Sequence, residues 1–108
     1  MDTGPFSISL AVKNLSASRS FYRTLGFKVI DGDGETWAMM QRHETKIGLF
    51  EGMFEDNMLT FSPSDCRAVA SALVADGYEI ESGAGASDDS VHFMVSDPDG
   101  NRILFDQR

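Results

Sequence analysis

The run Ser90-Val91-His92-Phe93-Met94-Val95-Ser96, followed by Asp97-Pro98-Asp99-Gly100 and then Asn101-Arg102-Ile103-Leu104-Phe105-Asp106, decides the fold of this chain. Two stretches in which apolar and polar residues alternate flank a short polar turn. In that turn the proline fixes one backbone angle, the glycine accepts a positive φ, and the aspartates can bond to the backbone. The pattern predicts a β-hairpin, and this hairpin ends the second of two similar halves.

The first half has a strand, a helix and three further strands. Asn14 is the expected N-cap of the helix, whose apolar residues recur at spacings of three or four, and Gly26 ends it. The last two strands form a hairpin around His43 and Glu44. The expected elements are a strand at 6–12, a helix at 15–25, and strands at 27–30, 36–41 and 46–51.

The second half repeats this order. Ser62-Pro63-Ser64-Asp65 suggests a capping box with the proline in the first helical position. Gly77 ends the helix, and a loop rich in glycine, alanine and serine runs from residue 82 to residue 89. The expected elements are a strand at 57–61, a helix that begins near Cys66, a strand at 78–81 and the closing hairpin.

The two halves align when the first is moved onto the second. Asn14 then falls on Asp65, and Gly26-Phe27 falls on Gly77-Tyr78. Two copies are too few for a stacked repeat array. The sequence therefore predicts an α+β fold in one domain, residues 1–108, made of two β-α-β-β-β modules at about 5–52 and 57–108. We expect their curled sheets to enclose a cleft.

Composition excludes several classes of protein. The chain has 108 residues, a net charge of −8, a single cysteine, Cys66, and no run of apolar residues long enough to span a membrane. No basic cluster is present, so we expect neither nucleic acid nor a membrane as a partner. One cysteine excludes an internal disulfide framework. The first five residues lack the features of a signal peptide, and we expect a cytoplasmic protein.

Two motifs carry a resemblance to a known family. The run from Ser9 to Leu15, followed by Phe21-Tyr22 and by Leu25-Gly26-Phe27, resembles the first module of the vicinal-oxygen-chelate superfamily. The turn from Asp97 to Asn101 is similar to the one before that family's last strand. The superfamily includes glyoxalase I, bleomycin-resistance proteins, fosfomycin-resistance enzymes and extradiol dioxygenases. The resemblance implies a homodimer whose cleft is formed within one chain or shared across the interface.

The resemblance also implies a divalent metal held by four side chains, one on the first and one on the last strand of each module. The matching positions in this chain are Ser7, Leu49 (or Gly48 after a shift of one residue), Met58 and Leu104. Imidazoles and carboxylates are the usual ligands of such a metal, and none stands at these positions. We therefore expect no metal and no cofactor.

Strand alternation predicts which side chains line the cleft. Apolar residues such as Ile8, Phe61 and Phe93 should pack against the helices. The opposite faces should form an apolar surface rich in aromatic and thioether groups, which is typical of ligand pockets. This expected cleft consists of Ser7, Ser9, Trp37, Met39, Gln41, Leu49, Glu51, Met58, Thr60, His92, Met94, Leu104 and Asp106.

Single residues offer chemistry beside simpler structural roles. His92 is a weak candidate for a general base, with Glu51 or Asp106 as the acid that orients it, or it is a hydrogen-bonded histidine. Trp37 is a ligand platform or core filling. Cys66 lies where a helix start stabilises thiolates, although its place on an apolar stripe favours a buried, inert thiol.

Three functions remain open from the sequence. The favoured one is a metal-independent, sequestration-type protein that binds an apolar or aromatic small molecule, and the net charge of −8 is compatible with a cationic one. This resembles the bleomycin-resistance branch, which protects by binding. The alternative is a glyoxalase- or dioxygenase-like enzyme, a lyase or isomerase, with a relocated or non-standard active site. The third is an interaction domain whose cleft binds nothing specific.

Overall fold

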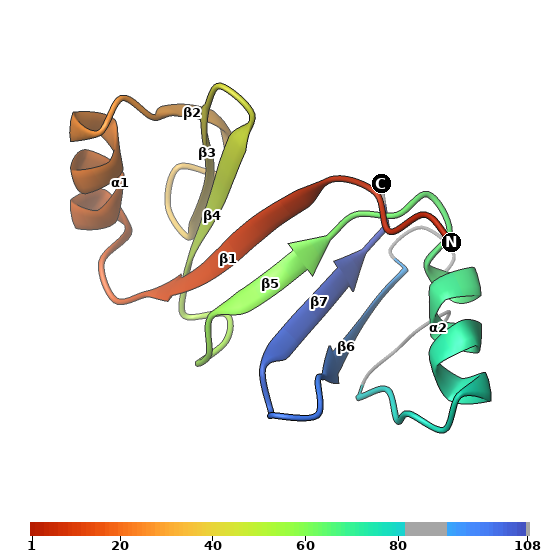
Figure 1. The fold of residues 1–108 in the computed structure, drawn as a ribbon. Helices are drawn as coiled ribbons and strands as arrows, with labels where there is room; N and C mark the ends of the chain where they lie inside the picture. Colours follow the sequence, from red (N-terminus) through yellow and green to blue (C-terminus); the bar gives the residue numbers. More distant parts are fainter. Residues whose placement is uncertain (82–90, 108) are drawn as a thin grey trace. The chain divides into compact units, whose positions relative to one another are not determined.

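A computed structural model describes residues 1–81 and 91–107, so the predicted loop at 82–89 lies outside the described residues. The elements in this part of the chain are β1 (Phe6–Val12), α1 (Leu15–Thr24), β2 (Lys28–Gly32), β3 (Trp37–Arg42), β4 (Thr45–Glu51), β5 (Met58–Phe61), α2 (Cys66–Ala75), β6 (His92–Ser96) and β7 (Arg102–Asp106) (Figure 1). The α+β class is confirmed. None of the described helices is long and apolar enough to cross a membrane.

The chain divides into two compact units. One is Ser7–Asn57, the N-terminal unit, and the other joins Met58–Arg108 to Met1–Phe6 and is the C-terminal unit. Each unit contains one helix and its own set of hydrogen-bonded strands (Figure 1).

The N-terminal unit has the strand order β2-β3-β4-β1. β1 runs parallel to β4, and the other neighbours are antiparallel. One face of these strands packs against α1, because alternate residues on each strand are apolar. The core of this unit consists of Leu15, Phe27, Ala38, Met40 and Leu49, with Leu10, Val12, Tyr22 and Ile47 packed around it.

The start of α1 is fixed by two side-chain acceptors. The Oδ1 atom of Asn14 accepts a hydrogen bond of 3.0 Å from the N–H of Ala17, which confirms the predicted N-cap. A carboxylate from β4 adds a second bond, because Oε1 of Glu51 accepts from the N–H of Leu15 at 2.8 Å. Both bonds satisfy amide groups that the first helical turn leaves without a partner.

The C-terminal unit has β7 between β5 and β6, with β7 parallel to β5 and antiparallel to β6. α2 begins after Asp65, whose side chain accepts from the N–H of Ala68 at 3.1 Å. Pro63 precedes the helix, so its expected place in the first helical position is wrong. The core consists of Cys66, Val69, Ala70, Val91, Phe93, Val95 and Phe105, with Phe61, Leu73, Ile80 and Ile103 packed around it.

The predicted strand at 78–81 is not a strand in the structure. The N–H of Tyr78 donates to the carbonyl of Leu73 at 3.0 Å, which closes the end of α2 and removes this group from strand pairing. The N–H of Glu81 still donates to the carbonyl of Met94 on β6, at 2.7 Å.

The β6–β7 hairpin is confirmed, and Asp97 organises its turn. Its Oδ1 atom accepts from the N–H groups of Asp99 at 3.0 Å and Asn101 at 2.9 Å, and its Oδ2 atom accepts from the side-chain amide of Asn101 at 2.8 Å. These bonds hold the pKa of the Asp97 carboxyl below its usual range, the Asn101 side chain contributing most. Gly100 has a φ of 89°, as the turn requires.

The first residues of the chain belong to the C-terminal unit. The N–H of Ser62 donates to the carbonyl of Pro5 at 3.0 Å, and the rings of Phe6 and Phe61 have centroids 5.4 Å apart. Gly4 has a φ of 71°, and a Cβ atom there would lie 2.1 Å from the carbonyl oxygen of Ser62. The segment therefore lies directly against the backbone that follows β5.

Candidate functional site

An aromatic group lies on the face of the N-terminal sheet opposite α1, which we call the aromatic face. The β3–β4 register places Trp37 opposite Phe50, and Met39 opposite Gly48. The β1–β4 register adds Ser9, also opposite Gly48. Since side chains alternate along a strand, these five residues share the face that α1 does not cover.

The rings on this face are packed together. Trp37 and Phe50 are stacked with centroids 6.0 Å apart, and Phe50 meets Phe54 at 5.3 Å with an interplanar angle of 47°. A Cβ atom at Gly48 would lie 2.7 Å from Cε2 of Phe50 and 3.4 Å from Cε of Met39. The glycine thus leaves room for the phenyl ring and the thioether to lie over the strand. The result is an apolar surface of three partly buried rings and a buried methionine.

Five of the expected cleft residues share the aromatic face. Trp37, Met39 and Gln41 alternate along β3, and Ser7 and Ser9 alternate along β1. Ser7, Ser9 and Met39 are buried, whereas Trp37 and Gln41 are partly exposed. That these side chains contact a ligand stays a prediction.

Leu49 and Glu51 do not share that face, and their expected placement beside Trp37 is wrong. Leu49 is fully buried in the core against α1, and the Glu51 carboxylate bonds to the start of that helix. The two-residue turn pairs Arg42 with Thr45, so the partner of Trp37 is Phe50. Leu49 and Glu51 therefore point to the opposite side.

The sequence reasoning missed Phe50 and Phe54 as parts of a candidate site. Phe50 could have been found, because a two-residue turn at His43 and Glu44 fixes which residues of the hairpin stand opposite each other. Phe54 follows β4 in an irregular segment, where no strand periodicity assigns a side chain to a face.

In the C-terminal unit, the expected cleft residues share one face of the strands, opposite α2. Thr60 and Met94 each stand opposite Leu104, and His92 stands opposite Asp106. Met58 lies two residues before Thr60 on β5 and therefore on the same side. Met58 and Thr60 are buried, His92 is exposed, and the others lie between these extremes. Their contact with a ligand also stays a prediction.

Arg102 on β7 is held by neighbouring side chains. Its guanidinium forms a salt bridge with the carboxylate of Glu81 and donates to Sδ of Met94 at 3.6 Å. The hydroxyl of Ser96 donates to the same carboxylate at 3.1 Å. The bond from Arg102 holds the pKa of Glu81 below its usual range. This arginine is thus part of a local polar network.

Cys66 is fully buried in the first turn of α2. Burial raises the pKa of its thiol, and the nearby carboxylates of Asp106 and Asp65 raise it further. A raised pKa keeps the thiol protonated near neutral pH, and a protonated thiol is a poor nucleophile. The structure therefore favours the inert interpretation of this cysteine.

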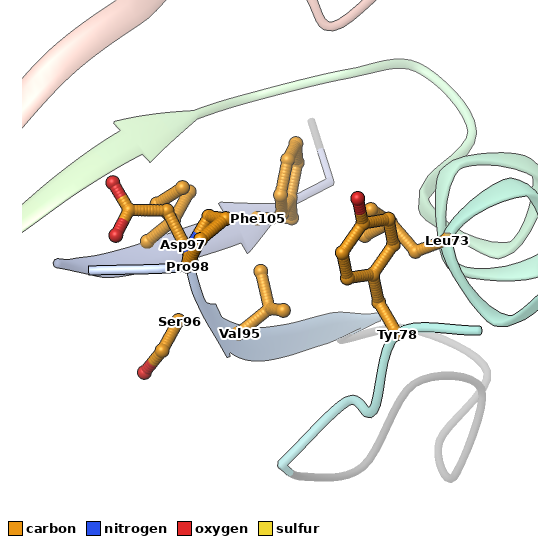
Figure 2. Close-up of a pocket in the computed structure, with 8 residues that line it drawn as sticks. Leu73, Tyr78, Val95, Ser96, Asp97, Pro98 and Phe105 are labelled. Atoms are coloured by element: carbon orange, nitrogen blue, oxygen red, sulfur yellow. The ribbon is translucent and has the colours of Figure 1, made fainter. Parts of the chain in front are cut away.

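A hollow of about 280 Å³ opens on the helix side of the C-terminal strands (Figure 2). Figure 2 shows the side chains of Tyr78, Phe105 and Val95 turned toward a common space, with Leu73 of α2 beside them. Its lining is mainly apolar, and Ser96 to Pro98 form its edge. The sequence reasoning did not find this hollow, because it placed Tyr78 on a strand.

The residues at the expected metal positions do not fit a divalent metal. Ser7 and Met58 are buried, Leu49 is core, and Leu104 has no ligand atom in its side chain. Within residues 1–81 and 91–107, no group of three or more His, Cys, Asp and Glu side chains is placed to hold a metal ion.

The comparisons with known proteins settle the family. The sequence model of the Glyoxalase/Bleomycin resistance protein/Dioxygenase superfamily matches residues 5–105. The chain belongs to this superfamily, and the resemblance inferred from its motifs is confirmed. No curated protein matches the chain at a significant level.

Solved structures agree on the fold. An NAD-dependent benzaldehyde dehydrogenase from Legionella pneumophila is 20% identical, with 95% of this chain and 98% of that chain covered and a TM-score of 0.78. A superfamily member from Vibrio splendidus is 19% identical over 95% and 97%, with a TM-score of 0.69. Streptomyces coelicolor methylmalonyl-CoA epimerase is 19% identical over 98% of each chain, with a TM-score of 0.73. At such identities the similarity shows the fold alone.

Proposed function

We propose that this protein binds a small, largely apolar or aromatic molecule without a metal, in the manner of the sequestration-type members of its superfamily. The observation that carries the proposal is the group formed by Trp37, Phe50 and Phe54 on the aromatic face, with Met39 beside it. These residues supply contact area with few polar groups, which is the usual composition of a ligand site.

The packing of the rings supports a preorganised platform. Trp37 and Phe50 differ by only 6° in ring orientation, so the two rings are stacked and hold each other in a fixed orientation. Aromatic contacts of this kind contribute about 0.5–1.5 kcal/mol each beyond the area they bury. The same ring faces attract cations, and the net charge of −8 favours a cationic group on the ligand. The thioether of Met39 can adapt to an irregular ligand outline.

The proposal needs no metal for binding. Ser7, Leu49, Met58 and Leu104 stand where the superfamily's metal ligands are expected, and none of them is an imidazole or a carboxylate. The first measurement is therefore metal titration of the purified protein by calorimetry. A stoichiometric metal bound more tightly than about micromolar would contradict the metal-free proposal.

The binding test uses Trp37, the single tryptophan of the chain. A library of aromatic and cationic aromatic compounds is screened by the change in Trp37 emission, and each hit is measured by calorimetry. Phe50→Leu should weaken a hit about tenfold, which corresponds to about 1.4 kcal/mol. Phe21→Leu is the matched control, because Phe21 is an exposed phenylalanine of α1.

Two results would contradict this assignment. Equal affinity in wild type and Phe50→Leu would show that the aromatic face does not hold the ligand. A hit whose affinity, measured by calorimetry, is unchanged in Phe50→Leu and lost in Leu73→Trp would move the site to the hollow of about 280 Å³ in the C-terminal unit.

The alternative function is a glyoxalase- or dioxygenase-like enzyme, a lyase or isomerase, and one pair of residues favours it. His92 stands opposite Asp106 on adjacent strands, an arrangement in which a carboxylate can orient an imidazole that acts as a base. The test is the exchange of carbon-bound protons of 2-oxo compounds and thioesters in D₂O, followed by NMR. Exchange that His92→Gln abolishes and His43→Gln retains would favour the enzyme over the binder.

We further propose a cytoplasmic homodimer, following the superfamily resemblance. Light scattering after size-exclusion chromatography tests the dimer, since a monomer and a dimer of this 11.8 kDa chain differ twofold in mass. A monomer at all concentrations would contradict this part of the proposal and leave the ligand test unaffected. Fractionation of cells that express the protein tests the compartment.

A further inference from the structure

A hollow of about 380 Å³ in the N-terminal unit is lined by Gly26, Lys28, Gln41, Arg42 and His43. It lies where the end of α1 and the start of β2 meet the end of β3 and its turn. Lys28 stands opposite Gln41 on the neighbouring strand. Two of the five residues carry a positive charge at neutral pH, His43 adds an imidazole, and none is acidic.

This concentration of positive charge is unusual for the chain. Acidic residues outnumber lysine and arginine by 17 to 9. Within the part of the chain that the structure describes, neither Lys28 nor Arg42 forms a salt bridge with a carboxylate. The positive charges of Lys28 and Arg42 are therefore available to an anionic ligand.

The backbone around the hollow positions its side chains. Gly26 has a φ of 99°, and a Cβ atom there would lie 2.6 Å from Nε of Arg42, so the arginine side chain lies closely over this glycine. Nε2 of Gln41 donates to the carbonyl of His43 at 2.9 Å. His43 itself has a φ of 55°, as the first residue of a two-residue hairpin turn requires.

We propose that this hollow is an anion site that takes the phosphate group of a small molecule. Arginine offers a planar fork of N–H donors that matches phosphate oxygens, and lysine adds a point charge. The imidazole of His43 and the side-chain amide of Gln41 are further donors at the same place. The site goes beyond the proposed function, because it uses none of the aromatic rings.

The exposure of these side chains sets the strength of binding. Lys28, Arg42 and His43 are solvent-exposed, so salt screens their charges over about 10 Å at 0.1 M. We expect a dissociation constant on the order of 1 mM for inorganic phosphate. The affinity should fall as sodium chloride is added.

The experiment is a titration of the ¹⁵N-labelled protein, at constant ionic strength, with inorganic phosphate and then with phenyl phosphate. Saturable shifts in the amide signals of residues 26, 28 and 41–43 are expected. Arg42→Gln should weaken phosphate binding at least fivefold. Lys13→Gln removes one exposed positive charge elsewhere in the same unit and should change the affinity less than twofold. The spectrum of each variant also reports whether it is folded.

The outcomes are distinct. Tighter binding of phenyl phosphate than of phosphate identifies an organic phosphate as the ligand, and equal binding identifies free phosphate. The proposed anion site would be contradicted by amide shifts that grow linearly with phosphate concentration or that occur near all basic residues. It would also be contradicted by shifts in Arg42→Gln equal to those in wild type. Trp37 emission should not change with inorganic phosphate, so failure of this site and failure of the aromatic face are measured separately.

Discussion

Trp37 on β3 and Phe50 on β4 stand directly opposite each other, with their ring centroids 6.0 Å apart and their planes 6° from parallel. A stacked cross-strand pair stabilises the hairpin and also favours its register, because a shift of one residue would place the two rings on opposite faces of the sheet. The same two rings form the proposed ligand-binding surface. A change in their geometry should therefore alter both the free energy of unfolding and the affinity for the ligand.

Gly48→Ala should disturb this platform. The new Cβ atom would lie 2.7 Å from Cε2 of Phe50, and the ring must move. Overpacking of this kind costs about 1–3 kcal/mol. Urea unfolding measures the loss, and Trp37 emission reports the displaced ring. Adding Phe50→Ala removes the clash, so Gly48→Ala should then cost less than in the wild type. Equal costs in the two backgrounds would show that the ring does not lie over Gly48.

Glu51→Ala should destabilise the protein through α1 and leave ligand binding intact. Oε1 of Glu51 accepts from the N–H of Leu15, and a lost cap of this type costs about 1 kcal/mol. Glu51→Gln keeps an acceptor oxygen and should cost less. Glu44→Ala, at an exposed site in the β3–β4 turn, is the control for lost charge. A stability of Glu51→Ala equal to that of Glu44→Ala would contradict the capping role.

The pKa of Asp97 predicts a loss of stability in acid. Hydrogen bonds from Asn101 lower this pKa below the ordinary value of 3.8, so the fold prefers the carboxylate to the acid. A depressed pKa contributes stability above the unfolded-state value, and this contribution is lost as the pH falls through the folded-state value. Thermal unfolding between pH 7 and pH 2 measures it.

The Asp97 variant isolates this contribution. Wild type should lose more stability below about pH 4 than Asp97→Asn, because the variant has no group to titrate at this position. Asp99→Asn is the control, since Asp99 donates to Asp97 through its backbone N–H, which the substitution leaves in place. Glu81, whose pKa is lowered by Arg102, titrates in wild type and variants alike. Parallel pH profiles for wild type and Asp97→Asn would contradict the prediction.

Cys66 should react slowly with an aromatic disulfide at pH 8 in the native protein. Burial and the carboxylates of Asp106 and Asp65 raise the pKa of its thiol, and the reactive species is the thiolate. The rate in urea-unfolded protein is the reference, and the native rate should be at least about tenfold lower. Asp106→Asn removes one of the two carboxylates and should increase the native rate. Equal rates in native and unfolded protein would show that the thiol is accessible.

The fold was predictable because its signals are local. Asn14, Gly26 and the turn from Asp97 to Asn101 mark element ends by their own chemistry, and the structure confirms each of them. The prediction of a strand at 78–81 was wrong because the N–H of Tyr78 donates to the carbonyl of Leu73 at the end of α2. The alternation of apolar and polar residues gives no sign of this hydrogen bond. The expected place of Pro63 in the first helical position was wrong because the side chain of Asp65 accepts from the N–H of Ala68 and starts the helix after Pro63.

The candidate site was harder to predict than the fold. Alternation assigned Trp37 and Met39 to the face opposite α1, but it says nothing of which partner each meets across the strand pair. That depends on the turn at His43 and Glu44, and a register one residue out exchanged Phe50 for Leu49. The hollow around Arg42 depends on the position of the Arg42 side chain over Gly26. The spacing of apolar and polar residues in the sequence does not predict that position.

The segment from Met1 to Phe6 is tied to the C-terminal unit, although it is encoded before the N-terminal one. A protein divided at residue 57 would therefore not yield two self-sufficient halves. The fragment that begins at Met58 would lack the bond from Ser62 to Pro5 and the contact of Phe61 with Phe6. During synthesis, residues 1–6 leave the ribosome before Phe61 and Ser62 and gain these partners only after the N-terminal unit has been made. The order of synthesis and the order in which the units can be completed are thus different.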